Sequence, residues 1–146
     1  TLVLIVSGVL ATSTQQKYIV NTAQWPPGAF WTSNEEIVGY LWLKDNLPQG
    51  AKVFTYVNNA PIIAYDKFTC HWCDEVIDFQ KNGFNKSVDL TYDFLKNNKY
   101  GYIAVDGQTA KKFGDSETNE KVKSLVSSGK FQPIHQNSGF IIFKIL

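Results

Sequence analysis

The sequence predicts an α/β domain in which a mainly parallel sheet is flanked by helices and followed by a C-terminal antiparallel hairpin. Three observations carry this prediction. A capped helical pattern runs into a β-rich segment, an apolar strand pattern lies between two further helical patterns, and the last two apolar runs are separated by an Asn-Ser-Gly turn. The chain of 146 residues is 44% hydrophobic and 14% aromatic, which is sufficient for one packed core.

The first helix is expected to begin at Ser33, because Ser33 and Glu36 have the spacing of a capping box. Pro48 and Gly50 end this helix, since neither residue continues a helical pattern. Its apolar stripe consists of Ile37, Tyr40, Leu41 and Leu47.

Three segments carry strand patterns. Residues 51–57 are rich in β-forming side chains and predict a strand. Residues 61–65 are compatible with a short second strand or with a helical turn. Residues 99–105 are apolar with little alternation, as expected for a strand covered on both faces, and Asp106 and Gly107 end it.

Two more helices and a hairpin complete the predicted domain. The second helix is expected to start near Ser87, and the third to cover residues 116–127 with Gly129 as its C-terminal stop. Residues 131–135 and 140–146 form the hairpin. The helix side chains expected to face the core are Val88, Leu90, Phe94, Leu95, Val122, Leu125 and Val126.

The N-terminal part is expected to lie outside this domain. Residues 1–10 carry no charge, and they are either a buried strand or core helix segment, or the outer end of a transmembrane helix. We assign residues 1–32 to this apolar stub and a turn-rich connector, and residues 33–146 to the single α/β domain. Three aromatic residues are expected to pack the connector onto the domain: Trp25, Phe30 and Trp31. The sequence contains no methionine, even at its start, which we interpret as a sign that it is a piece of a longer protein.

The charge pattern argues against nucleic-acid binding. The net charge is +1, and all 14 basic residues are lysines. Arginine is the usual residue for bidentate recognition of phosphate and of guanine edges, and no basic stripe replaces it. The sequence also lacks a glycine-rich phosphate loop, a nucleophile elbow and a zinc-protease motif. We therefore predict no catalytic residue, no metal site and no cofactor in this chain.

Four residues are candidates for ligand binding. Ligands of parallel sheets bind outside the carboxyl ends of strands, and Asn58 and Asp106 lie at two predicted strand ends. Asp66 follows a strand-like segment, and Trp72 is an aromatic residue between the two cysteines. Asp66 and Asp106 are the only pair of carboxylates that could converge, since both leave neighbouring predicted strands, and we assign them no catalytic role. Nothing around them predicts the apolar pocket that would raise one pKa for glycoside cleavage.

Two short polar patterns have both a functional and a structural interpretation. Residues 85–87, Asn-Lys-Ser, match the acceptor sequon for N-glycosylation, a pattern that also occurs by chance. Asp74, Glu75 and Asp78 are acidic residues suited to a cation, but they are also typical of a solvated helix N-terminus.

Cys70 and Cys73 form a C-x-x-C motif with four interpretations. A structural disulfide in an oxidising compartment is favoured, and free, partly buried thiols are the next alternative. A zinc site lacks a second cysteine pair, with only His71 and His135 left as further ligands. A redox site would require the motif to follow a strand and to open a helix.

The order of these features resembles a known arrangement. Residues 35–53, which read EEIVGYLWLKDNLPQGAKV, resemble the start of the extracytoplasmic domain that follows the last membrane helix in GT-C class glycosyltransferases. This class includes protein mannosyltransferase-like proteins and oligosaccharyltransferases. Residues 98–106 resemble a later strand of that domain. The W-W-D-Y-G motif of oligosaccharyltransferases is absent, because residues 54–59 read FTYVNN at the matching position.

The resemblance implies an accessory, outward-facing domain of a polytopic membrane enzyme whose catalytic carboxylates lie between membrane helices. Its partners would be a lipid-phosphate-linked sugar or an acceptor, bound through the parent protein, and it would lie on the extracytoplasmic side of a membrane. Two alternatives stay open. The chain is a secreted ligand-binding module, or it is a thiol–disulfide exchanger that uses Cys70 and Cys73.

Overall fold

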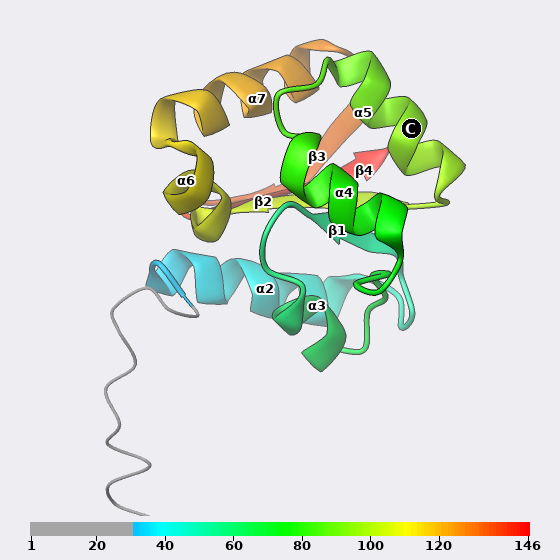
Figure 1. Ribbon diagram of the computed structural model, residues 1–146. Helices are drawn as coiled ribbons and strands as arrows, with labels where there is room; N and C mark the ends of the chain where they lie inside the picture. The colour runs from blue at the N-terminus through cyan, green and yellow to red at the C-terminus, as the bar shows by residue number, and fades with distance from the viewer. Residues whose placement is uncertain (1–30) are drawn as a thin grey trace, which may run out of the picture.

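The computed structural model describes residues 31–146 (Figure 1). The apolar stub, Trp25 and Phe30, for which expectations were stated above, lie outside the described residues. The elements are α2 (Asn34–Asn46), β1 (Val53–Thr55), α3 (Ala60–Ala64), α4 (Asp74–Asn82), α5 (Val88–Asn97), β2 (Tyr102–Asp106), α6 (Gly107–Phe113), α7 (Asp115–Ser127), β3 (Phe131–Gln136) and β4 (Phe140–Ile145).

The expected α/β class and the C-terminal hairpin are confirmed. The four strands have the order β1-β2-β4-β3, and β1 is parallel to β2, whereas β4 is antiparallel to both β2 and β3. The sheet is therefore mixed, with one parallel pair among its three pairings. The reason is that the hairpin inserts β4 beside β2, where Ile103 pairs with Phe143.

Helices cover both faces of the sheet, as Figure 1 shows, with α2 and α3 on one side and α4, α5 and α7 on the other. Alternation along β2 and β4 supplies both cores. Ile103 and Phe143 are buried in the core beneath the larger group of helices, and Ala104 and Ile142 are buried in the core beneath α2. Trp31 packs on this second core, with its ring 5.5 Å from that of Tyr40.

The expected N-cap of the first helix is confirmed, with one difference in the capping box. Ser33 Oγ accepts a hydrogen bond from the Glu36 backbone N–H at 3.1 Å. The Glu36 carboxylate does not return to Ser33. It accepts instead from the backbone N–H and the hydroxyl of Thr32, so that the reciprocal bond is made one residue earlier.

The buried faces of two helices differ from the expectation. Leu90 is 56% exposed and Val126 is 48% exposed, so both predictions of burial are wrong. On α5 the buried face is formed by Thr91 and Leu95, one residue further along than a stripe through Leu90. On α7, Leu125 takes the core position.

Three other elements differ in type or extent. The segment after β1 is the helix α3, which decides between the two interpretations of residues 61–65. The strand expected over residues 51–57 is confined to β1. The chain continues after Asp106 into α6, a helix that the sequence patterns did not predict.

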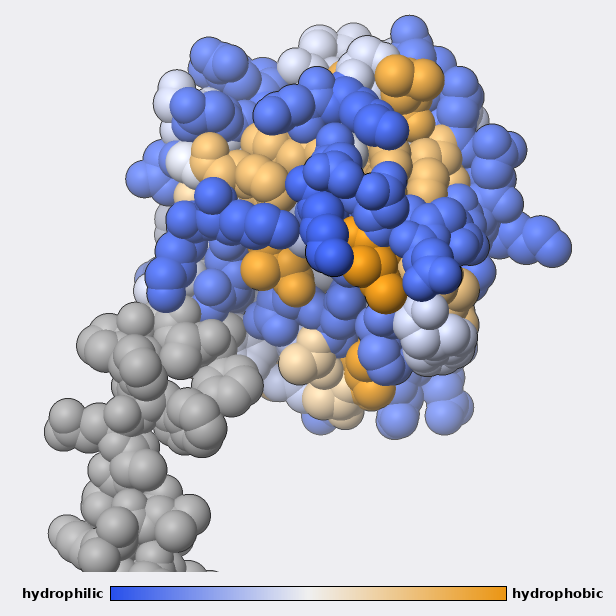
Figure 2. All heavy atoms as spheres, in the orientation of Figure 1, coloured by the Kyte–Doolittle hydropathy of each residue, from blue (hydrophilic) through white to orange (hydrophobic). Residues whose placement is uncertain are grey.

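Most of the visible surface is hydrophilic, as Figure 2 shows, and the apolar areas on that face are separated by polar side chains. The exposed large apolar residues are Val38, Leu41, Ile63, Trp72, Leu90, Val126 and Leu146. Val38 and Leu41 both belong to α2, and the other five come from separate segments. Exposure of single apolar residues is ordinary for a folded domain.

Gly39 provides a test of how α2 packs on the sheet. A Cβ atom at this position would overlap the ring and Cβ of Phe140 on β4. In an exposed helix, replacing glycine with alanine would stabilise by about 1 kcal/mol. We expect Gly39→Ala to lower the free energy of unfolding by about 1–3 kcal/mol, because overpacking outweighs the gain in helix propensity.

Urea denaturation measures this change. Gly101→Ala is the matched control, because a Cβ atom there meets only the Lys52 carbonyl oxygen at 3.9 Å. A Gly39→Ala protein as stable as the control would show that α2 can move away from β4.

Candidate functional site

The candidate site is an open hollow at the carboxyl end of β2. Its volume is about 420 Å³, and it is bordered by the start of α6, one face of α7 and the turn between β3 and β4. A second hollow of about 520 Å³ adjoins it and extends to Thr32 and Ser33, where the chain enters α2. Gly107, Ala110 and Asp115 line both hollows.

Asp106 organises the floor of this region. It is the N-cap of α6, and its Oδ1 accepts from the backbone N–H of Thr109 at 2.9 Å and from the Thr109 hydroxyl at 2.7 Å. Its Oδ2 accepts from the Tyr40 hydroxyl at 2.7 Å. Burial raises the pKa of Asp106, and the hydrogen bonds from Thr109 and Tyr40 offset this only in part.

Glu36 is a second buried carboxyl group beside Asp106. Its Oε2 accepts from the Thr32 backbone N–H at 2.7 Å and from the Thr32 hydroxyl at 2.5 Å, while its Oε1 is buried without a partner. Burial raises the pKa of Glu36, and the charge of Asp106 raises it further, whereas the Thr32 bonds lower it. A Cβ atom at position 107 would overlap the Thr32 hydroxyl oxygen and lie 3.0 Å from Glu36 Oε2, so the bonded Thr32–Glu36 pair favours glycine where α6 begins.

The wall of the hollow is the polar face of α7. Asp115, Thr118 and Asn119 are spaced so that they share one face of the helix, and all three line the hollow. Thr118 is 7% exposed, and its hydroxyl has no hydrogen-bond partner. Such a group is ordinarily satisfied, so it is available to a ligand. Val122 and Ile141 add apolar surface to the lining.

The turn between β3 and β4 forms the opposite wall and is rigidly held. Asn137 donates from its side-chain amide to the Glu35 backbone carbonyl at 2.7 Å, and its Oδ1 accepts from Gly139 N–H at 2.9 Å. These bonds tie the hairpin turn to the first turn of α2. The hollow is thus bounded by elements whose positions are fixed by packing and by hydrogen bonds.

The four predicted ligand residues do not come together. Asn58 follows β1 and Asp106 is the last residue of β2, so both lie at the carboxyl edge of this parallel pair. Asp66 lies near the opposite edge, because its carbonyl accepts from Gly50 and the adjoining Phe68 pairs with Lys52 before β1. Asp66 and Asp106 therefore do not converge.

Trp72 lies away from the hollow and is 62% exposed. Its ring packs edge to face against Phe68 and His71. Phe68 pairs with Lys52 just before β1, so Trp72 packs on the segment beside the start of this strand. Trp72 lines neither of the two hollows.

Sequence reasoning did not find Glu36, Tyr40 or Thr118 as members of this site. The sequence patterns assigned Glu36 to helix capping and Tyr40 to the core. They did not reveal the hydrogen bonds of Glu36 with Thr32 or of Tyr40 with Asp106. Thr118 carried one available signal: it follows Asp115 by three residues on a helix that begins with acidic and polar side chains.

A disulfide joins Cys70 and Cys73, whose Cα atoms are 5.4 Å apart. Cys70 is buried, and its backbone N–H donates to the Tyr100 hydroxyl at 3.2 Å. Cys73 is the N-cap residue of α4. Among residues 31–146, no group of three or more His, Cys, Asp or Glu side chains is arranged to hold a metal ion.

Comparisons with known proteins do not identify a family for this chain. No family model matches the sequence, and no curated protein matches it. Within the described part of the chain, no helix combines the length and the apolar character that crossing a bilayer requires. The function must therefore be argued from the site itself.

Glu36 gives a prediction on pH dependence. The pKa of Glu36 in the folded protein is raised above the ordinary value of 4.5, which applies to the unfolded chain. Folding therefore becomes less favourable as the pH rises from 4.5 to the folded pKa. Glu36→Gln removes this titration. We expect the stability of the Gln variant relative to the wild type to be higher at about pH 7 than at about pH 4.

The measurement is chemical denaturation of both proteins across this pH range. Glu35→Gln is the matched control, because Glu35 is an exposed carboxyl group in the same helical turn. The same stability difference at both pH values would contradict the assignment of a buried, titrating Glu36.

The cysteine pair gives a second prediction. Unreduced protein, once unfolded, is expected to expose no free thiol to a thiol reagent. Cys70→Ser with Cys73→Ser is expected to lower the free energy of unfolding by about 2 kcal/mol, because the closed loop is short. Two titrating thiols would contradict the structural disulfide. Turnover in an insulin-reduction assay, lost in Cys70→Ser, would instead favour a thiol–disulfide exchanger.

Proposed function

We propose that this domain is an accessory, outward-facing part of a polytopic, glycosyltransferase-like membrane protein, and that its hollow helps to hold a sugar-bearing donor or acceptor. The transfer chemistry would be carried out by residues elsewhere in the parent protein. The resemblance of residues 35–53 to the extracytoplasmic domain of GT-C enzymes motivates the proposal. It corresponds to α2, the following turn and the start of β1.

The observation that carries the proposal is the polar face of α7 in the hollow, on which the Thr118 hydroxyl is buried without a partner. Thr118 offers a buried hydroxyl, and Asp115 and Asn119 offer a carboxylate and an amide at the rim. Carboxylates and amides can each bond to neighbouring hydroxyl groups. Val122 and Ile141 offer apolar surface beside them. This combination suits a sugar, which has hydroxyl groups and apolar C–H surface.

The position of the hollow also supports the proposal. Thr32 and Ser33 line the adjoining hollow, so the chain enters the domain next to the proposed binding surface. A membrane part that precedes this domain would place its own outer surface near the hollow. Both Asp106 oxygens have structural hydrogen-bond partners, and Glu36 lines neither hollow, which is why we assign recognition to α7 and not to them.

The proposal predicts a binding defect without a chemical defect. In the full-length membrane protein, Asp115→Ala combined with Asn119→Ala is expected to raise the KM for the sugar donor or acceptor about tenfold and to leave kcat unchanged, because these groups supply binding hydrogen bonds. Lys123→Ala is the matched control, since Lys123 is exposed on the same helix but lines neither hollow.

Three results would contradict the proposal in different ways. A gene that encodes no series of hydrophobic spans before Thr1 would remove the membrane-enzyme context. A signal peptide directly before Thr1 would favour the secreted binding module. An unchanged KM in the double variant would remove the role of the hollow.

A further inference from the structure

The turn between α4 and α5 carries the one N-x-Ser/Thr sequon in the sequence, at residues 85–87. The turn is closed by a hydrogen bond from the Lys86 N–H to the Gly83 carbonyl at 3.1 Å. Asn85 is exposed within this turn, and Phe84 before it is buried. The backbone is therefore anchored, while the Asn85 side chain is presented to solvent.

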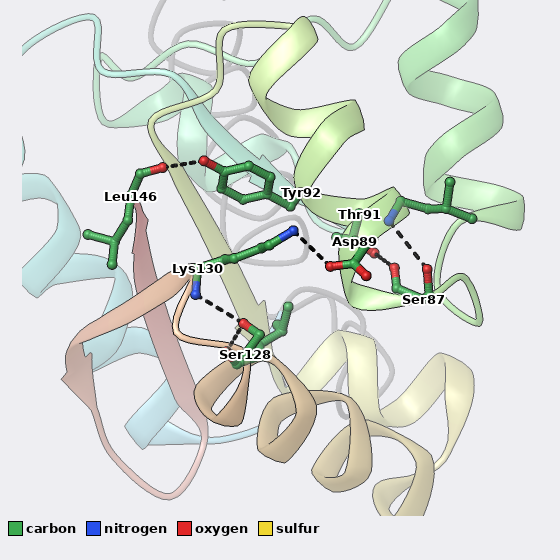
Figure 3. A network of polar contacts seen from close by, with 9 residues as sticks. Ser87, Asp89, Thr91, Tyr92, Ser128, Lys130 and Leu146 are labelled. Atoms are coloured by element: carbon green, nitrogen blue, oxygen red, sulfur yellow. Dashed lines mark hydrogen bonds and ion pairs between the residues drawn. The ribbon is translucent and has the colours of Figure 1, made fainter.

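The third residue of the sequon has a compatible structural role. Ser87 is the N-cap of α5, and its Oγ accepts from the Leu90 backbone N–H at 3.3 Å. Figure 3 shows Ser87 at the start of this helix, with the Thr91 hydroxyl bonded to the Ser87 carbonyl at 2.9 Å. The cap uses the hydroxyl as an acceptor, so its own hydrogen remains available as a donor.

A polar hollow of about 240 Å³ lies beside the sequon, between the turn and α7. Glu117, Glu120 and Ser124 line its far side. Lys121 connects the two sides, because its Nζ donates to the Lys86 carbonyl at 2.7 Å and to Thr91 Oγ1 at 3.1 Å. Burial lowers the pKa of Lys121 to about 8. This surface can accept hydrogen bonds from the hydroxyl groups of a sugar ring.

We propose that Asn85 is a glycan attachment site, and that the first sugar of the glycan packs into the hollow between the α4–α5 turn and α7. The step joins Asn85 Nδ2 to the anomeric carbon of a lipid-phosphate- or lipid-pyrophosphate-linked sugar. The bond from that carbon to the phosphate oxygen breaks, the lipid phosphate leaves with the electron pair, and one amide proton passes to a base of the transferase. The proposal rests on the extracytoplasmic location in the proposed function, but not on any role of the hollow at Asp115 and Thr118.

The test expresses the whole chain behind a cleavable signal, in a secretory host that fully glycosylates a reporter with an unstructured Asn-Lys-Ser tag. The expected result is one glycan at Asn85, seen by intact mass and removed by an amidase that cleaves N-glycans. Asn85→Gln should abolish the modification. Because the host imposes the location, failure here is distinct from failure of the membrane-enzyme proposal.

Position 87 offers a matched pair of variants. Ser87→Thr keeps both the sequon and the helix cap and should keep the glycan, whereas Ser87→Asp keeps the cap alone and should lose it. A folded wild-type protein that leaves the host without a glycan would overturn the proposal.

Slower amide exchange over residues 117–124 in the glycosylated protein than in Asn85→Gln would support packing of the sugar in the hollow. Equal exchange would overturn that packing.

Discussion

The hydrogen bond between the Tyr40 hydroxyl and Asp106 joins the parts of this domain that the site depends on. Both residues are buried, and the bond is 2.7 Å long. Tyr40 belongs to α2, and Asp106 is the last residue of β2 and the N-cap of α6. One carboxyl group thus connects the helix beneath the sheet, the central parallel strand and the helix that follows it. Its burial is tolerated because three donors satisfy it.

Glu36 extends this arrangement to the place where the chain enters the domain. By accepting from Thr32 it fixes the residue before the N-cap, at the expense of leaving Oε1 without a partner. Two neighbouring buried carboxyl groups repel each other when both are charged. Burial is the main cause of the raised pKa of both groups, and the charge of Asp106 adds to the raised pKa of Glu36. The entry to α2 is therefore held by bonds whose strength depends on pH, close to the candidate site.

Signals between residues close in the sequence predicted much of this fold. Hydrogen bonds between residues far apart in the sequence could not be predicted. Ser33 and Ser87 were predicted as helix starts, and both are N-caps whose side chains accept the expected backbone bonds. Such caps depend on residues only three positions apart. Leu90 was placed on the wrong face because Thr91 is buried and bonded to Lys121, 30 residues away. The site residues Glu36, Tyr40 and Asp106 were each visible in the sequence, but Asp106 approaches the other two only when α2 packs on the sheet.

The hollow itself depends on the corner between α6 and α7. Gly114 adopts a φ of 100°, a conformation that side chains other than glycine rarely accept, and this residue ends α6 and caps α7. The reversal brings α7 back across the carboxyl end of β2, so that Asp115 and Thr118 face Asp106 across the hollow. Asp106 is already satisfied by its own fold contacts, and Glu36 lines neither hollow, so the Thr118 hydroxyl is the buried group of the lining that has capacity for a ligand. Asp106 lies at the carboxyl end of a parallel strand, where ligands of such sheets bind. It therefore holds the floor of the site in place, and α7 supplies the binding surface.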